Sequence, residues 1–143
     1  MIYLESCALV KLIREEDESQ ALQAWLDERA GEVMVTSELA RAEVLRVIRR
    51  NNHTERGELI DARKLTADLD EAAAVLEAVT QVVVDRKIVN RAGAIEAPML
   101  RTLDAIHLAT ALDLQASTIE FVTYDRRLAA VVGQAGLVAV SPV

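Results

Sequence analysis

The stretch MIYLESCALVKLI, residues 1–13, sets the fold class because an apolar strand gives way within it to a helix. We expect Ile2 to Leu4 to form a central strand, and the aliphatic run Ala8 to Ile13 to continue as a helix. The switch falls at the acidic residue Glu5. An acid directly after a buried parallel strand stands at the edge of the sheet where ligands usually bind.

Strands and helices continue to alternate along the rest of the chain. We predict three further strands, at 33–35, 119–124 and 137–140, and leave 82–84 open between a strand and an extended link. Helices are predicted at 18–29, 38–50, 54–66, 70–79, 85–94, 100–114 and 126–132. Thr36 and Ser37 are expected to supply N-cap oxygens, and the helices at 54–66 and 70–79 to form an antiparallel pair. The alternation predicts an α/β fold with a mainly parallel sheet.

The length of 143 residues, without a linker or repeat, indicates one domain spanning residues 1–143. Hydrophobic residues make up 52% of the chain but aromatic residues only 3%, so the interior must be largely aliphatic. The single cysteine, Cys7, cannot form an internal disulfide. The N-terminus does not read as a signal peptide and no apolar run is long enough to span a membrane, so we expect a soluble, cytoplasmic protein.

The net charge of −7 argues against tight, sequence-independent binding of nucleic acid. It does not exclude a nuclease, because carboxylates that hold divalent cations make a site locally negative until the cation is bound. It also suits a protein that binds a basic partner.

Four carboxylates stand out by position. Glu5 and Asp125 each follow an apolar strand, and either one alone could be no more than a helix N-cap. Glu43 lies beside the apolar face of its helix, where it either pairs with Arg46 or serves a site. Asp104 opens the most apolar helix and could likewise be an N-cap. Taken together, four such carboxylates without a histidine cluster suit a hard cation such as Mg²⁺ or Mn²⁺ and the phosphodiester hydrolysis that it supports.

The segments around these acids resemble the motifs of one known family. The family's four motifs are matched in order by MIYLESCALVKLI with Glu5, TSELARAEVLRVIRR with Glu43, LRTLDAIHLATAL with Asp104, and FVTYDRRLAAVVGQAGLVAV with Asp125. The chain is therefore similar to the PIN-domain family, in particular to the VapC-type toxins of VapBC toxin–antitoxin systems.

The resemblance implies a three-layer α/β/α sandwich and an Mg²⁺- or Mn²⁺-dependent endoribonuclease that cuts transfer or ribosomal RNA. It also implies inhibition by a VapB-like antitoxin and a homodimer. Glu5, Asp104 and Asp125 would be the principal metal ligands, and Glu43 a further ligand or the residue that orients the attacking water.

One residue departs from the family pattern, since the first acid is normally aspartate and this chain has Glu5. The extra methylene moves the carboxylate by roughly 1 Å, and a displacement of about 1 Å can cost about 100-fold in rate. We therefore expect attenuated activity. A compensated natural variant, a degenerate toxin and an engineered change remain open as explanations.

Two other classes of function are compatible with this architecture. A catalytically silent module that binds the antitoxin within a repressor complex is the alternative that Glu5 favours. A phospho-acceptor signalling domain shares the architecture, but Asp125 is followed by Arg126 and Arg127, with no lysine beyond Lys87, so we set it aside.

Several neighbouring residues are candidates for supporting roles. Ser6 and Thr123 either hydrogen-bond a carboxylate or metal-bound water, or bond the local backbone. His107 is expected to be a partly buried structural residue. Candidate RNA contacts, which are otherwise solvated surface charges, are Arg46, Arg50 and Arg126. The apolar surface of the helices within 54–79 is expected to pack a dimer or to bind an antitoxin helix.

Overall fold

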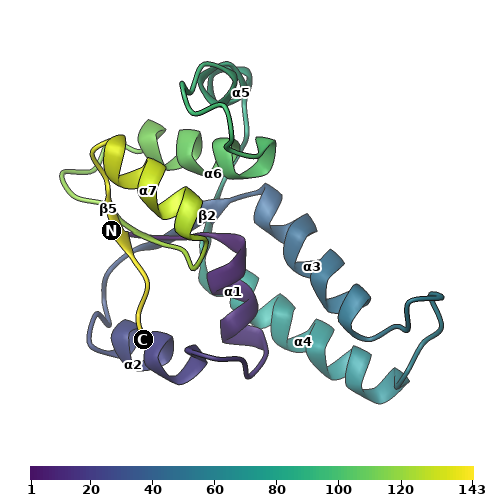
Figure 1. Cartoon of the computed structure of the whole chain (residues 1–143). Coiled ribbons are helices and arrows are strands. Elements are labelled where there is room, and N and C mark those ends of the chain that lie inside the picture. The colour runs from purple at the N-terminus through teal and green to yellow at the C-terminus, as the bar shows by residue number, and fades with distance from the viewer.

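The computed structural model describes all 143 residues and has a five-stranded parallel sheet at its centre (Figure 1). The sheet has the order β3-β2-β1-β4-β5 and every neighbouring pair is parallel. Its strands are β1 (Ile2–Leu4), β2 (Met34–Ser37), β3 (Thr80–Val82), β4 (Glu120–Val122) and β5 (Val138–Val140). Because all five strands run the same way, their carboxyl ends meet at one edge, where α/β sheets bind ligands.

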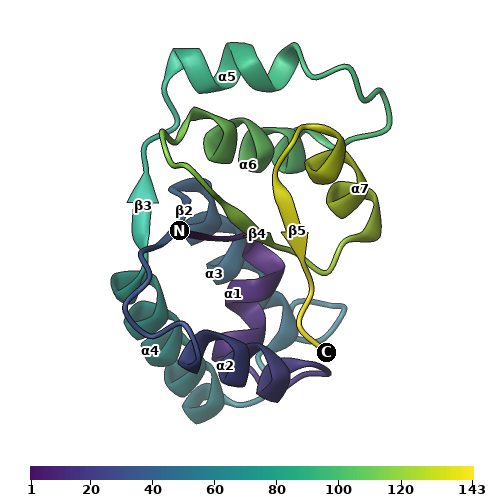
Figure 2. The ribbon, with the colours of Figure 1, turned by 90° about the vertical axis from the view of Figure 1, so that its left-hand side faces the viewer.

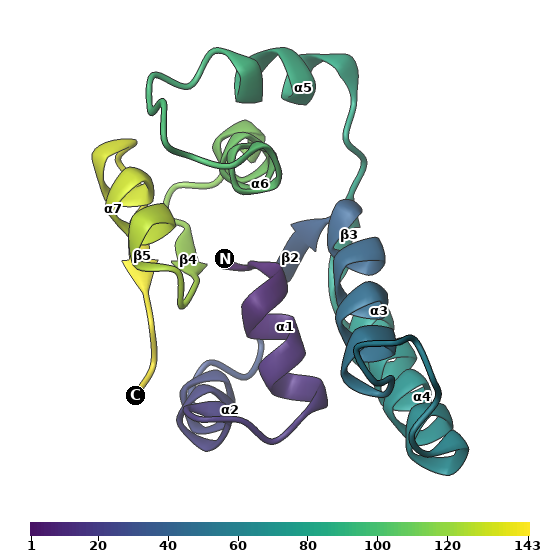
Figure 3. The same cartoon turned by 45° about the vertical axis from the view of Figure 1, so that its right-hand side comes forward.

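Helices cover both faces of the sheet, which gives the expected three-layer α/β/α sandwich (Figures 2 and 3). The first layer holds α1 (Ser6–Ile13), α2 (Ser19–Asp27), α3 (Leu39–Asn51) and α4 (Ala62–Ala78). The second layer holds α6 (Thr102–Asp113) and α7 (Arg126–Gln134), with α5 (Arg86–Gly93) packed on the outside of α6. None of these helices is both long and apolar enough to cross a membrane.

The central strand β1 supplies side chains to both layers because successive residues of a strand point to opposite faces. Ile2 and Leu4 belong to the core under α1 to α4, whereas Tyr3 belongs to the core under α6 and α7. The ring of Tyr3 stacks on Phe121 of β4 with 4.7 Å between centroids. All four side chains are fully buried, so β1 joins the two cores.

The antiparallel helix pair predicted for 54–66 and 70–79 is wrong. Residues 54–61 form turns, with a φ of 83° at Gly57, and one continuous helix, α4, follows them. Asp61 begins α4 by accepting hydrogen bonds from the backbone N–H groups of Arg63 and Lys64. In the structure α4 packs against both α3 and α1.

The ends of two strands also differ from the prediction. β2 runs through Thr36 and Ser37, so only Ser37 serves the start of α3, where its Oγ accepts from the N–H of Leu39 at 3.3 Å. The hydroxyl of Thr36 instead donates to the carbonyl of Leu4 at 2.7 Å and links β2 to β1. Of the run 82–84, only Val82 belongs to a strand, since β3 begins earlier, at Thr80, and ends at Val82; residues 83 and 84 lie beyond it.

Candidate active site

The four acids singled out in the sequence gather at the carboxyl edge of the sheet. Glu5 follows β1 and Asp125 lies just beyond β4, while Glu43 reaches the same edge from α3 and Asp104 from the first turn of α6. Burial raises the pKa of Asp104, and the charges of Asp125 and Glu43 raise it further. These carboxylates are thus close enough for their charges to act on one another.

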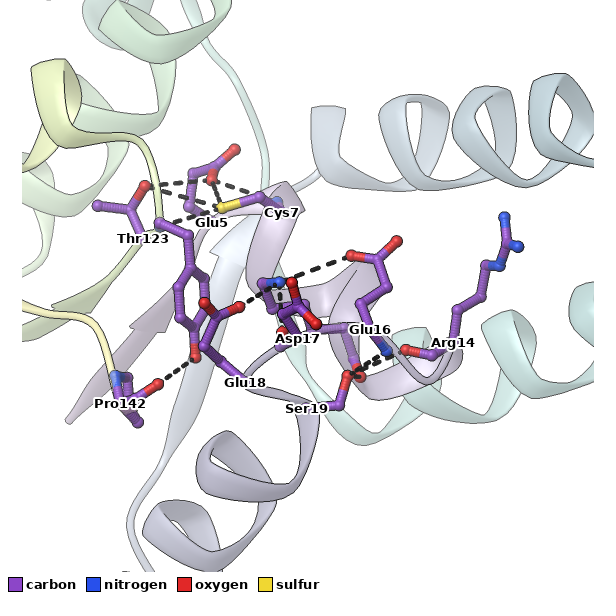
Figure 4. A network of polar contacts seen from close by, with 11 residues as sticks. Glu5, Cys7, Arg14, Glu16, Asp17, Glu18, Ser19, Thr123 and Pro142 are labelled. Atoms are coloured by element: carbon purple, nitrogen blue, oxygen red, sulfur yellow. Dashed lines mark hydrogen bonds and ion pairs between the residues drawn. The ribbon is translucent and has the colours of Figure 1, made fainter.

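Glu5 is a buried carboxylate held by one of its two oxygens (Figure 4). Oε2 accepts from the backbone N–H of Cys7 at 3.2 Å and from the hydroxyl of Thr123 at 3.3 Å, and it also takes a short contact from the Cys7 thiol. Burial raises the pKa of Glu5, and His107 and Cys7 only partly offset the effect. Burial and the adjacent Glu5 raise the pKa of the Cys7 thiol to about 12, so Cys7 is a hydrogen-bond donor here and not a nucleophile.

Glu43 is held in the same manner, by two donors on a single oxygen. Its Oε2 accepts from the hydroxyl of Ser6 at 2.5 Å and lies 2.7 Å from Nε2 of His107. Burial alone would raise the pKa of Glu43, but the hydrogen bonds from His107 and Ser6 outweigh it and hold the pKa below its ordinary value. The alternative pairing with Arg46 does not occur, since no ion pair joins the two side chains.

Asp104 and Asp125 differ in how they are held. Asp125 does cap a helix, because its Oδ1 accepts from the N–H groups of Arg127 at 2.7 Å and Leu128 at 3.2 Å. Asp104 is not an N-cap, since α6 already begins at Thr102, and its carboxylate makes no hydrogen bond within the protein. Asp104 therefore keeps both oxygens available to a ligand.

The supporting residues contact the carboxylates directly. Ser6 bonds Glu43, and Thr123 bonds Glu5 while also accepting from the N–H of Asp125 at 3.2 Å. His107 was expected to be a partly buried structural residue, but it is fully buried and is bonded to Glu43. The available signal was a lone imidazole on an apolar helix one turn beyond Asp104, because a buried polar group needs a partner.

The arginines proposed from the sequence lie on the surface of the protein. Arg46 and Arg50 are exposed on α3 and line a hollow of about 880 Å³. The rest of its lining contains no hydrophobic residue and consists of Arg49, His53, Thr54, Glu55 and Gly57. Arg126 is exposed separately, at the first position of α7.

The donor chemistry of the site fits a hard cation. Glu5 and Glu43 each leave Oε1 without a hydrogen bond from the protein, and Asp104 leaves both of its oxygens free. The atoms available to bind a cation are therefore carboxylate oxygens. No group of three or more His, Cys, Asp or Glu side chains is drawn together in the geometry of a ligand shell. The site thus has the atoms that Mg²⁺ or Mn²⁺ prefers, set apart rather than closed around a point.

The chain matches known proteins along nearly its whole length. The PIN domain family model matches residues 2–134. Ribonuclease VapC35 of Mycobacterium tuberculosis is 40% identical over 99% of this chain and 97% of its own length. Ribonucleases VapC47 and VapC46 of the same species are 36% and 37% identical, again over 99% of the chain and 97% of their own lengths.

A solved structure supports the fold independently. The crystal structure of FitAcB from Neisseria gonorrhoeae contains a chain that superposes with a TM-score of 0.76 at 16% identity, covering 99% of this chain and 98% of that one. Identity at that level carries the fold alone, and it agrees with the parallel sheet and its two helical layers. From the family model and the VapC relatives together, the chain belongs to the PIN domain family.

Proposed function

We propose that the chain is the ribonuclease toxin of a toxin–antitoxin pair and that it hydrolyses RNA phosphodiester bonds with the help of a divalent cation. The observation that carries the proposal is the meeting of Glu5, Glu43, Asp104 and Asp125 at one edge of the sheet, from four separate elements. The ribonuclease relatives, aligned from end to end, support the same chemistry.

Glu5, Asp104 and Asp125 would hold Mg²⁺ or Mn²⁺, with Glu43 as a further ligand or as the residue that orients the attacking water. When bound, the cation supplies Lewis-acid stabilisation of the charge that develops on the phosphate. The protein's own contribution is to hold the carboxylates still. Thr123 and Cys7 fix Glu5, and Ser6 and His107 fix Glu43.

The direct test is cleavage of labelled RNA with and without Mn²⁺ or Mg²⁺, comparing the wild type with Asp104→Asn. Asp70→Asn is the matched control, because Asp70 is an exposed aspartate on α4, remote from the site. We expect cation-dependent cleavage that Asp104→Asn abolishes and Asp70→Asn leaves unchanged. Lack of any cleavage by the wild type would favour the alternative, a catalytically silent module that acts by binding its antitoxin.

We further propose that RNA lies along α3, where Arg46 and Arg50 follow Glu43 on the same helix. Both guanidinium groups are exposed and neither forms an ion pair, so they are available to phosphate oxygens. Arg126, next to Asp125 at the start of α7, would contact phosphate on the other side of the carboxylates. Such a local cluster of positive charge would attract RNA phosphates, which the net charge of −7 as a whole does not.

The proposed protein partner is a VapB-like antitoxin. A hollow of about 340 Å³ between α1, α2 and α4 is lined mainly by apolar residues, among them Leu12, Leu26 and Val75, and it would accept the apolar face of a helix. Co-purification of a tagged chain with the product of the adjacent reading frame, compared between wild type and Val75→Glu, tests this placement. A homodimer is proposed from the family and is checked by light scattering on the purified protein. The proposed location is the cytoplasm.

A further inference from the structure

A line of buried side chains runs from β1 through α6 to the carboxylate of Glu43. The hydroxyl of Tyr3 lies 2.8 Å from Nδ1 of His107, and Nε2 of the same ring lies 2.7 Å from Oε2 of Glu43. Tyr3 and His107 have no exposed surface, and their rings meet edge to face with 5.9 Å between centroids. The line therefore joins the core under α6 to the site across the sheet.

The direction of each hydrogen bond follows from what the end group can do. A carboxylate only accepts, so Nε2 of His107 carries the hydrogen that is donated to Glu43. When the imidazole is neutral, the other nitrogen is an acceptor, and the hydroxyl of Tyr3 then donates to Nδ1. Tyr3 thereby fixes which nitrogen of His107 faces Glu43 as a donor.

The two hydrogen-bond donors to Glu43 both bond the same carboxylate oxygen and leave the other oxygen unbonded. Both Ser6 and His107 bond Oε2, and their own atoms lie 3.0 Å apart because they converge on the same acceptor. Oε1 receives no hydrogen bond from the protein. The rotation of the carboxylate is therefore set by the two bonds to Oε2, and Oε1 is the oxygen left without a protein partner.

We propose that Tyr3 and His107 are positioning residues that hold Glu43 by Oε2, so that Oε1 is presented to the cation or the attacking water. The inference rests on the proposed function and deepens it, because it assigns different tasks to the two oxygens of Glu43. Groups that hold metal-binding side chains in place typically change metal affinity or activity by about 10-fold to 100-fold when removed.

If His107 had a merely structural role, every shorter side chain at this position would lower activity to the same extent. The test therefore compares two amide side chains, glutamine and asparagine. His107→Gln places an amide nitrogen at the distance of Nε2 and keeps a donor for Glu43, whereas His107→Asn reaches only as far as Nδ1. Tyr3→Phe removes the donor to Nδ1. Tyr124→Phe is the matched control, because the hydroxyl of Tyr124 bonds only the carbonyl of Pro142.

The measurements are Mn²⁺ affinity by electron paramagnetic resonance, kcat and KM on RNA, and thermal unfolding. We expect His107→Asn to weaken Mn²⁺ binding and to lower kcat by about 10-fold or more, with KM nearly unchanged. For His107→Gln, Mn²⁺ affinity and kcat should stay within about 3-fold of the wild-type values, although its melting temperature should fall about as much as that of His107→Asn. Equal losses in the two amide variants would overturn the proposal.

The direction of the hydrogen bonds between Tyr3, His107 and Glu43 is tested by ¹⁵N NMR of the two histidines of the metal-free protein, which shows which ring nitrogen carries the hydrogen. His107 should carry its hydrogen on Nε2. His53 serves as the internal contrast, since its Nδ1 lies 2.5 Å from the carbonyl of Arg49 and must be its donor. Tyr3→Phe should give His107 a mixed signal. A hydrogen on Nδ1 of His107 in the wild type would overturn the proposal even if RNA is cleaved. Absence of Mn²⁺ binding with the expected ¹⁵N pattern would instead overturn the proposed function, and the assignment of Oε1 with it.

Discussion

The hydroxyl of Thr123 donates to Oε2 of Glu5 at 3.3 Å and so ties the end of β4 to the end of β1. Both residues are buried, and the same hydroxyl accepts from the N–H of Asp125 at 3.2 Å. One small side chain therefore controls the spacing of two of the proposed ligands.

Replacing Thr123 tests whether that spacing matters. Thr123→Val keeps the volume but removes the hydroxyl, and we expect metal-dependent cleavage to fall by about 10-fold to 100-fold. Thr123→Ser keeps the hydroxyl and should retain most of the activity. The comparison is made by initial rates on one RNA at saturating Mn²⁺. Similar rates for the valine and serine variants would rule out a role for the hydroxyl.

Shortening Glu5 tests the attenuation expected from the sequence. Glu5→Asp draws the carboxylate back by roughly 1 Å, toward the N–H of Cys7 that it already caps. We expect the rate of RNA cleavage to rise, by about 10-fold or more, because a displacement of about 1 Å can cost 100-fold. Glu77→Asp, an exposed position on α4, is the matched control. An unchanged or lower rate in Glu5→Asp would show that the backbone around Glu5 already suits the longer side chain.

Salt dependence tests the proposed path of RNA along α3. In an Asp104→Asn background, which we expect to bind RNA without cutting it, Arg46→Gln and Arg50→Gln should each weaken RNA binding and reduce the salt slope by about 0.7 per lost phosphate contact with single-stranded RNA. Arg63→Gln on α4 is the control, since Arg63 is also exposed and forms no ion pair. Fluorescence anisotropy at several salt concentrations gives the slopes. A slope that is unaltered by both substitutions would place the RNA elsewhere.

The pairing of α3 with α4 gives a prediction for stability against pH. Burial alone would raise the pKa of Asp68, but hydrogen bonds from Asn52 at 2.8 Å and Lys64 at 2.7 Å hold it below its ordinary value of 3.8. A lowered pKa in the folded state stabilises the protein above the ordinary pKa, and the contribution is lost as the pH falls through the folded-state value. Asp68→Asn should cost about 1 kcal/mol at pH 7, equivalent to about 3 °C in melting temperature, and less at pH 3. A constant difference between pH 7 and pH 3 would contradict this assignment.

The sequence predicts the architecture well where a pattern extends over many residues or includes a charged residue at an apolar position. The alternation of strands and helices fixed the parallel sheet, and the position of Glu43 beside an apolar helix face correctly marked a buried partner, although that partner is His107 rather than Arg46. The role of His107 could not be predicted, because its partners lie 104 and 64 residues away along the chain and no local pattern indicates such contacts.

Other errors arose where local signals conflict. Residues 54–61 have enough helix-forming side chains to extend a periodic pattern, but Gly57 adopts a positive φ and Asp61 caps a new start at α4. Strands of three or four residues are too short for period-two alternation to set their ends, so the observed ends of β2 and β3 differ from the predicted ones by one or two positions. The spacing of the carboxylates depends on the packing of four elements and is therefore a property of the folded chain alone.

The place of β4 in the sheet has a bearing on how a cell survives making this protein. β4 pairs directly with the N-terminal strand, yet it is the second-last strand to be synthesised, and Asp125 follows it. A chain still growing on the ribosome already contains Glu5, Glu43 and Asp104, but it lacks the neighbour that completes their edge. The nascent toxin should therefore be unable to cleave RNA until almost the whole polypeptide has been synthesised. An antitoxin already present in the cell then has time to bind it.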